Sequence, residues 1–115
     1  MHVHHAIDYI EFPVTDLERA KQFYAEAFGW EFNDYGPAYA GIRKEGGEAG
    51  GLRLAPAVPA GGPLVILYSQ DLERSLAAVR DAGGNITAEP FAFPGGHRFH
   101  FRDPSGNELA VWSER

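Results

Sequence analysis

The chain has 115 residues, a net charge of −6 and no cysteine, and 44% of its residues are hydrophobic. This length is enough for one domain with a real core, and the composition excludes disordered and collagen-like classes. The absence of cysteine excludes disulfides and thiolate metal sites. The negative net charge argues against nucleic acid as a partner. No apolar run is long enough to cross a bilayer. The N-terminus lacks the apolar region of a secretory signal. We therefore expect a cytoplasmic protein that does not bind membranes.

The first half of the chain predicts one strand, one helix and three short strands. Residues 7–14 alternate, which places Tyr9 and Glu11 on the face opposite the apolar residues. A capping box follows, with Thr15 and Glu18 serving the first free amides of a helix. The apolar stripe of this helix ends at a glycine. The short strands are expected near residues 30–35, 39–44 and 51–54.

The second half predicts the same order of elements after a linker rich in proline, glycine and alanine at 57–62. An apolar strand at 64–68 precedes a helix at 71–82, which stops at two glycines. The segment 103–107 (Asp-Pro-Ser-Gly-Asn) predicts a tight hairpin turn, because proline fixes φ while glycine and asparagine tolerate positive φ. Further strands are expected at residues 85–93, 97–102 and 108–112.

A repeat relates the two halves. Asp-Leu-Glu-Arg occurs at 16–19 and again at 71–74, each time after a strand and at the start of a helix. A repeat of about half the chain length indicates one structural unit used twice. We therefore predict an α+β fold with two βαβββ units, about 5–56 and about 63–115, packed as a single domain of residues 1–115.

Two stretches carry a resemblance to a known family. The first is residues 10–20, with the aromatic pairs that follow at 23–24 and 28–30, and the second is the hairpin 103–107. Together with the repeat they resemble the vicinal oxygen chelate superfamily, which includes glyoxalase I, extradiol dioxygenases and bleomycin resistance proteins. The resemblance covers essentially the whole chain. It implies two tandem βαβββ units forming a curved mixed sheet around a cleft, a small-molecule ligand and a homodimer.

The resemblance also implies where a divalent metal would be bound. The family's ligand positions fall on Tyr9 in the first strand, Leu64 in the fifth and Ala110 in the last, and the remaining ligand would come from residues 51–55. Those residues offer only Leu52, Arg53 and Leu54 as side chains of any size. A divalent cation needs several oxygen or imidazole donors. We therefore predict no metal cofactor at the inherited site, and with it the loss of the usual metal-assisted chemistry.

Strand alternation predicts which side chains line the cleft. An aromatic lining with a few polar groups is typical of a small-molecule site. Trp112 is the expected ring platform, whereas Trp30 is expected to pack at the end of the first helix. The Tyr9 phenol would donate a proton or, as we favour, fill the space of the metal. The predicted ligand-binding residues are Tyr9, Glu11, Leu64, Ile66, Tyr68, Arg98, His100, Glu108 and Trp112.

Three cleft residues are candidates for catalysis. Glu11, His100 and Glu108 would hold a displaced divalent metal, or His100 and Glu11 would act as an acid/base pair near neutral pH. The interpretation we favour is that the two glutamates pair with Arg98 or Arg102, because buried carboxylates usually find a cation.

Three functions remain open from the sequence. The first is a metal-independent protein that binds an aromatic or amphipathic molecule. The second is a lyase, isomerase or dioxygenase relative with a displaced metal or a metal-free site, and the third is an interaction module with a vestigial cleft. The histidines His2, His4 and His5 would bind nickel adventitiously or, as we favour, belong to a frayed terminus.

Overall fold

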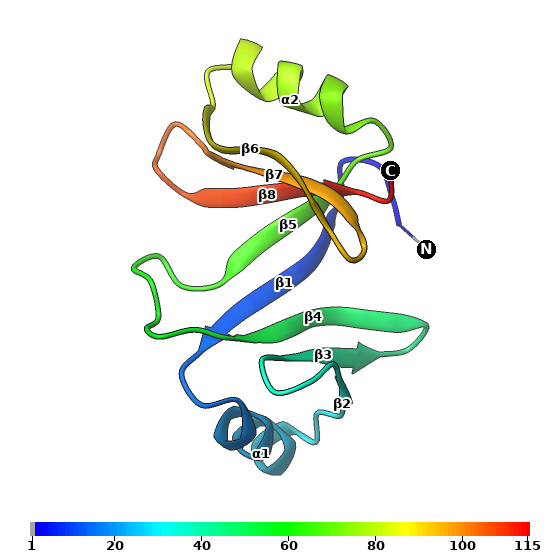
Figure 1. The fold of residues 1–115 in the computed structure, drawn as a ribbon, viewed down its shortest axis with the longest axis vertical. Helices are drawn as coiled ribbons and strands as arrows, with labels where there is room; N and C mark the ends of the chain where they lie inside the picture. The colour runs from blue at the N-terminus through cyan, green and yellow to red at the C-terminus, as the bar shows by residue number, and fades with distance from the viewer. Residues whose placement is uncertain (1) are drawn as a thin grey trace. The chain divides into compact units, whose positions relative to one another are not determined.

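The computed structural model describes residues 2–115, which fall into two compact units. The first unit is Tyr9–Pro63, and the second unit is residues 2–8 together with Leu64–Arg115. Each unit has one helix and a four-stranded mixed sheet (Figure 1). Neither helix of the described chain is long and apolar enough to cross a membrane. The predicted α+β fold with two βαβββ units is confirmed.

The first unit contains β1 (Ile7–Val14, which begins in the second unit), α1 (Leu17–Phe28), β2 (Phe32–Asp34), β3 (Tyr39–Lys44) and β4 (Gly47–Leu54). Its strands are ordered β2-β3-β4-β1. Strand β1 is parallel to β4, and the other neighbours are antiparallel. Strand β4 begins earlier than the predicted 51–54, because the turn at Gly46 returns the chain directly along β3.

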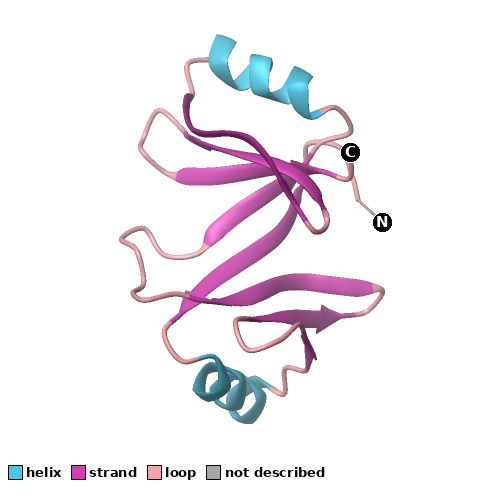
Figure 2. Cartoon of the chain, viewed as in Figure 1, coloured by secondary structure: helices cyan, strands magenta, loops and turns pink. Residues whose placement is uncertain are grey.

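The second unit repeats this topology. It contains β5 (Leu64–Tyr68), α2 (Leu72–Asp81), β6 (Asn85–Phe93), β7 (Gly96–Arg102) and β8 (Glu108–Ser113). The strand order is β5-β8-β7-β6, with β5 parallel to β8 (Figure 2). The repeat predicted from the two Asp-Leu-Glu-Arg segments therefore extends to every strand of the two units.

Both helices begin with an aspartate cap, which in the first helix takes the place of the predicted threonine cap. Asp16 Oδ1 accepts a hydrogen bond from the Arg19 amide at 3.0 Å, and Asp71 Oδ1 accepts one from the Arg74 amide at 3.2 Å. Aspartate is a strong N-cap, and its charge also suits the positive end of the helix dipole. The prediction that Thr15 caps the first helix was wrong because Asp16 is one residue closer to the free amides.

Each helix covers one face of its own sheet and builds a small core there. In the first unit Leu17 packs with Ala40, Ile42 and Leu52, and aromatic side chains complete the cluster. Trp30 is one of them and stacks on Tyr24 with ring centroids 4.6 Å apart, so its predicted packing role is confirmed. The second unit has an equivalent core of Leu72, Leu76, Phe99 and Val111. In each unit the other face of the sheet is not covered by that unit's helix.

Candidate functional site

The helix-free face of the first unit gathers tyrosine, glutamate and arginine from three strands. The register pairs Glu11 of β1 with Gly51 of β4, and Tyr39 of β3 with Arg53. Alternation then places Tyr9 on the same face as Glu11. A Cβ on Gly51 would overlap the Tyr39 hydroxyl, so this glycine makes room for the phenol. The strand register and the absence of a side chain at Gly51 together bring the Tyr39 phenol to the Glu11 carboxylate.

A hydrogen-bonded chain runs through this face. The Tyr9 and Tyr39 hydroxyls lie 2.7 Å apart, and the Tyr39 hydroxyl donates to Glu11 Oε2 at 3.0 Å. The Glu11 carboxylate is only 5% exposed, and its Oε1 lies 3.4 Å from Arg53 Nε. Within the unit the cation beside Glu11 is Arg53, which was not among its predicted partners and which alternation places on the same face. We call Tyr9, Tyr39, Glu11 and Arg53 the tyrosine–glutamate chain.

The two phenols of the tyrosine–glutamate chain are neutral at physiological pH. Burial raises the pKa of Tyr9 to about 12, with a smaller contribution from the nearby Glu48 and Glu11 charges. Burial also raises the pKa of Tyr39, and the adjacent Glu11 charge raises it further. Both hydroxyls therefore act as donors of neutral hydrogen bonds rather than as phenolates.

A second acidic residue lies on this face and was missed in the sequence. Glu48 Oε2 accepts hydrogen bonds from Asn33 at 2.9 Å and from the Tyr35 hydroxyl. The hydrogen bond from the Tyr35 hydroxyl to Glu48 raises the pKa of Tyr35. A Cβ on Gly41 would overlap the Glu48 carboxylate. Glu48 was missed because the predicted strand began after it, although the glycine pairs 46–47 and 50–51 indicated close backbone approaches nearby.

The helix-free face of the second unit brings together all the ligand residues predicted in that unit. The register pairs Tyr68 with Trp112 and Ile66 with Ala110 across β5 and β8. It also pairs Trp112 with Arg98 across β8 and β7. By alternation Leu64, His100 and Glu108 share this face. The predicted strand parity is therefore correct on both halves of the chain.

Aromatic rings dominate this second face. Tyr68 and Trp112 meet edge to face with centroids 5.2 Å apart, and Phe93 meets Trp112 at 6.0 Å. The Arg98 guanidinium lies 5.6 Å from the ring centres of both Phe91 and Phe93, within cation–π range. The face offers flat apolar walls and a cation in close proximity.

Two of the three catalytic candidates meet on this face. His100 Nδ1 lies 3.7 Å from Glu108 Oε2, and the same oxygen accepts a hydrogen bond from the Thr87 hydroxyl at 3.2 Å. The third candidate, Glu11, belongs to the first unit and to the tyrosine–glutamate chain. Arg102, one of the predicted arginine partners, lies opposite Glu108 in the register of β7 and β8, and the predicted ion pair between their side chains stays a prediction.

The inherited metal positions do not present a metal-binding set. Leu64 and Ala110 have no donor atom, and Tyr9 is a neutral phenol bonded to Tyr39. Throughout residues 2–115, no three histidine, aspartate or glutamate side chains come close enough to hold a metal ion. The chemistry of these residues does not fit the divalent ion that the resemblance implies.

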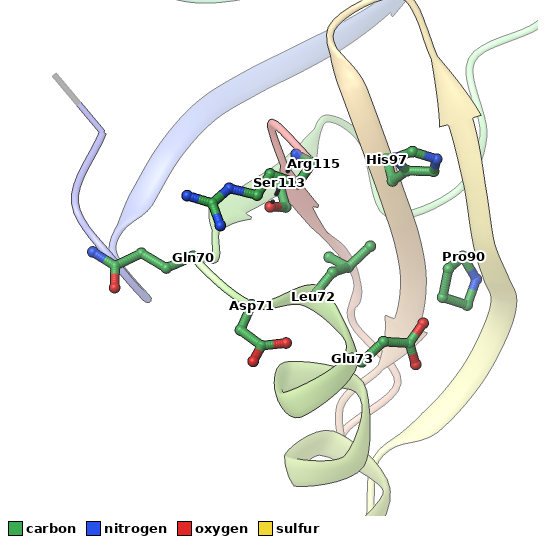
Figure 3. Close-up of a pocket in the computed structure, with 8 residues that line it drawn as sticks. All are labelled: Gln70, Asp71, Leu72, Glu73, Pro90, His97, Ser113 and Arg115. Atoms are coloured by element: carbon green, nitrogen blue, oxygen red, sulfur yellow. Dashed lines mark hydrogen bonds between the residues drawn. The ribbon is translucent and has the colours of Figure 1, made fainter.

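A pocket of the second unit lies on the helix side of the sheet, where α2 begins (Figure 3). Its volume is about 480 Å³. Its walls carry the carboxylates of Asp71 and Glu73 and the basic groups of His97 and Arg115, and Asp71 is engaged as the cap of α2. None of the predicted ligand residues lines it. The complete lining is Gln70, Asp71, Leu72, Glu73, Pro90, His97, Ser113 and Arg115.

The chain is similar to proteins of one superfamily. The sequence model of the Glyoxalase/Bleomycin resistance protein/Dioxygenase superfamily matches residues 6–111. A "Glyoxylase-like domain-containing protein" of Didymella fabae is 28% identical, and the match covers 96% of this chain and 95% of that protein.

Solved structures agree with this similarity. A Mn(II)-bound glyoxalase from Novosphingobium aromaticivorans is 26% identical with a TM-score of 0.72, over 98% of this chain and 40% of that one. Methylmalonyl-CoA epimerase from Streptomyces coelicolor is 18% identical with a TM-score of 0.70, over 96% of this chain and 98% of that one. At this lower identity the epimerase is evidence for the fold alone.

Proposed function

Because the chain belongs to the Glyoxalase/Bleomycin resistance protein/Dioxygenase superfamily, we propose that it binds a small aromatic or amphipathic molecule without a divalent metal cofactor. The proposed contact residues lie on the helix-free face of the sheet in each unit. The residues proposed to contact it are Tyr9, Glu11, Leu64, Ile66, Tyr68, Arg98, His100, Glu108 and Trp112.

The observation that carries this proposal is the replacement of donors by carbon and a neutral phenol. Leu64 and Ala110 offer no lone pair, and the Tyr9 hydroxyl is already bonded to Tyr39 at 2.7 Å. With its pKa raised to about 12, Tyr9 does not become an anionic ligand at neutral pH. A family scaffold with such positions retains a binding surface but lacks the usual metal ligands.

The aromatic face of the second unit supports the kind of ligand. Tyr68, Trp112 and Phe93 supply rings whose geometry suits stacked or edge-on contact with another ring. Arg98 supplies a cation beside them, which favours an anionic or polarised group on the ligand. A ring that bears a carboxylate or hydroxyl matches both features.

The test is a thermal-shift series on protein freed of metal with EDTA. The probes are 4-hydroxybenzoate, phenylacetate and 2-naphthol, and a ligand that binds only the native state raises the melting temperature. We expect at least one probe to raise it in a concentration-dependent manner, equally with EDTA or Mn²⁺. Trp112→Ala should abolish the shift, while the matched control Trp30→Phe should retain it. Failure of every probe, or a shift that needs the metal, contradicts the proposal.

A second candidate is an enzyme with metal-free acid/base chemistry, such as an isomerase or lyase. The tyrosine–glutamate chain favours it, because a buried carboxylate beside two neutral phenols could take a proton from one atom of a substrate and return it to another. The pair His100 and Glu108 offers a further acid/base couple. The test of this second candidate uses a small hydroxyketone in D₂O. NMR measures whether the protein exchanges the proton next to the carbonyl for deuterium. Glu11→Gln would abolish such exchange, and absence of exchange in the wild-type protein would contradict this candidate.

We also propose a homodimer. Helix α1 exposes Phe23 and Phe28, whose rings lie 6.5 Å apart and are 58% and 66% exposed. Exposed aromatic clusters often mark interaction surfaces. Light scattering should give twice the mass of one chain for the wild type, and a lower mass for Phe28→Ser.

A further inference from the structure

The N-terminal segment is docked on the second unit, in contrast to the frayed terminus that the sequence favoured. The His5 amide donates to the Tyr68 carbonyl at 2.7 Å, and the Tyr68 amide donates to the Ala6 carbonyl at 3.2 Å. The Gln70 amide donates to His4 Nδ1 at 2.9 Å. His5 Nε2 lies 3.0 Å from the Ser75 hydroxyl on α2. Backbone bonds along β5 therefore hold the segment independently of the His2 side chain.

This docking delivers the His2 ring to the aromatic face. The ring stacks on Tyr68, with centroids 4.9 Å apart and an interplanar angle of 23°. It meets Trp112 edge to face, also at 4.9 Å. His2 Nδ1 lies 2.9 Å from Asp8 Oδ1. One residue thus finds a stacking wall, an edge wall and a carboxylate acceptor.

The walls around His2 are fixed by their own partners. Trp112 Nε1 donates to Asp8 Oδ2 at 3.0 Å, and this bond orients the Asp8 carboxylate with its other oxygen toward His2. The Tyr68 hydroxyl donates to Glu114 Oε1 at 2.7 Å. The Asp8 side chain is 13% exposed and Tyr68 is 7% exposed, whereas the His2 side chain is 40% exposed. The walls belong to the body of the unit, and His2 is the part that reaches solvent.

We propose that Asp8, Tyr68 and Trp112 form a binding site for a planar nitrogen heterocycle that carries a ring N–H, and that His2 is an internal ligand occupying it. One ring that stacks on the ligand and a second ring that meets its edge select a flat ring, and the Asp8 carboxylate selects a ring N–H over an all-carbon ring. Imidazole, benzimidazole and larger heterocycles of this kind have the required chemistry. The inference rests on the proposed function, since Tyr68 and Trp112 belong to the proposed ligand-binding face.

An internal ligand lowers the apparent affinity for an external one. When a competent, open site is present only part of the time, the measured Kd rises in inverse proportion to the open fraction. The tether is short, so the local concentration of the His2 ring is on the order of millimolar. Removing the ring should therefore strengthen the binding of a matching heterocycle.

The test is a titration with benzimidazole in which NMR monitors the indole N–H signal of Trp112. The chain has only two tryptophans, so this signal is readily assigned. We expect His2→Ala to bind benzimidazole at least about five-fold more tightly than the wild type. Val3→Ala is the matched control, because Val3 is a neighbouring exposed residue, and its affinity should equal that of the wild type. In the His2→Ala background, Asp8→Asn should weaken benzimidazole about ten-fold and leave 2-naphthol unchanged.

The outcomes separate this inference from the proposed function. Equal benzimidazole affinity in the wild type and His2→Ala overturns the internal ligand. Equal affinity of His2→Ala for benzimidazole and 2-naphthol overturns the selection by Asp8. In both cases the proposed function is still supported if the aromatic probes raise the melting temperature of the wild type but not that of Trp112→Ala. Absence of any response at Trp112, together with no thermal shift, overturns both.

Discussion

Tyr39 is the residue on which the first unit's polar face depends. Its hydroxyl donates to the buried Glu11 carboxylate and contacts the hydroxyl of the half-buried Tyr9. Tyr39→Phe removes a donor from a carboxylate that is 5% exposed, so we expect a loss of roughly 1–3 kcal/mol in the free energy of unfolding. Urea denaturation measures it. Tyr35→Phe removes the hydroxyl of an exposed tyrosine that donates to Glu48, and it should cost less than about 1 kcal/mol. Equal losses would contradict the role assigned to Tyr39.

The raised pKa of Tyr9 predicts a pH effect at high pH. The neutral phenol is favoured in the folded protein, where burial raises the pKa of Tyr9 to about 12 from its ordinary value of 10.0. Between these values the unfolded chain loses its proton first. The contribution of Tyr9 is therefore complete below pH 10 and is lost as pH rises toward 12. Ultraviolet absorbance titrations of the wild type and of Tyr9→Phe should differ by one tyrosine that ionises near pH 12. Ionisation near pH 10 would contradict the buried hydrogen-bonded phenol.

At the residue scale the sequence predicted positions but not partners. Alternation in β1 correctly placed Tyr9 and Glu11 on one face, because period two is local information. Tyr39 lies 28 residues from Glu11, and its contact depends on a glycine in a third strand. Such a contact needs the pairing register, which a single strand does not contain.

At the scale of elements, the repeated Asp-Leu-Glu-Arg predicts equal capping energies. Asp16 and Asp71 each accept a hydrogen bond from the amide three residues later, at 3.0 and 3.2 Å. Asp16→Ala and Asp71→Ala should therefore each lower the free energy of unfolding by about 1 kcal/mol. Thr15→Ala should change it by less than about 0.5 kcal/mol. A larger loss for Thr15→Ala than for Asp16→Ala, measured by urea denaturation, would restore the threonine cap.

The elements also explain which predictions succeeded. Helices and most strands were predicted because amphipathic periodicity and glycine stops are strong local signals. The docked N-terminus was not, since Met-His-Val-His-His has no apolar periodicity. Its order comes from backbone bonds to β5 and from side-chain bonds to α2 and the segment before it, partners more than 60 residues away along the chain.

For the whole molecule, the repeat and two motifs were enough for the fold, while the ligand was beyond their reach. A fold of this kind serves several chemistries, so the proposed function rests on the few side chains of the helix-free faces and not on the fold itself. In this chain those side chains are mainly rings, one tyrosine–glutamate chain and a histidine–glutamate pair. The rings favour binding, and the carboxylates keep acid/base chemistry as the second candidate.

Calorimetric titration of metal-free protein with Mn²⁺ tests the central claim most directly. The protein should carry His2→Ala, His4→Ala and His5→Ala, so that the N-terminal histidines contribute no heat. The account predicts no saturable binding of one ion per chain, because Leu64 and Ala110 supply no donor and Tyr9 stays a neutral phenol. Tight binding of one Mn²⁺ per chain, weakened by Glu11→Gln or Glu108→Gln, would contradict it and favour a metal-dependent enzyme.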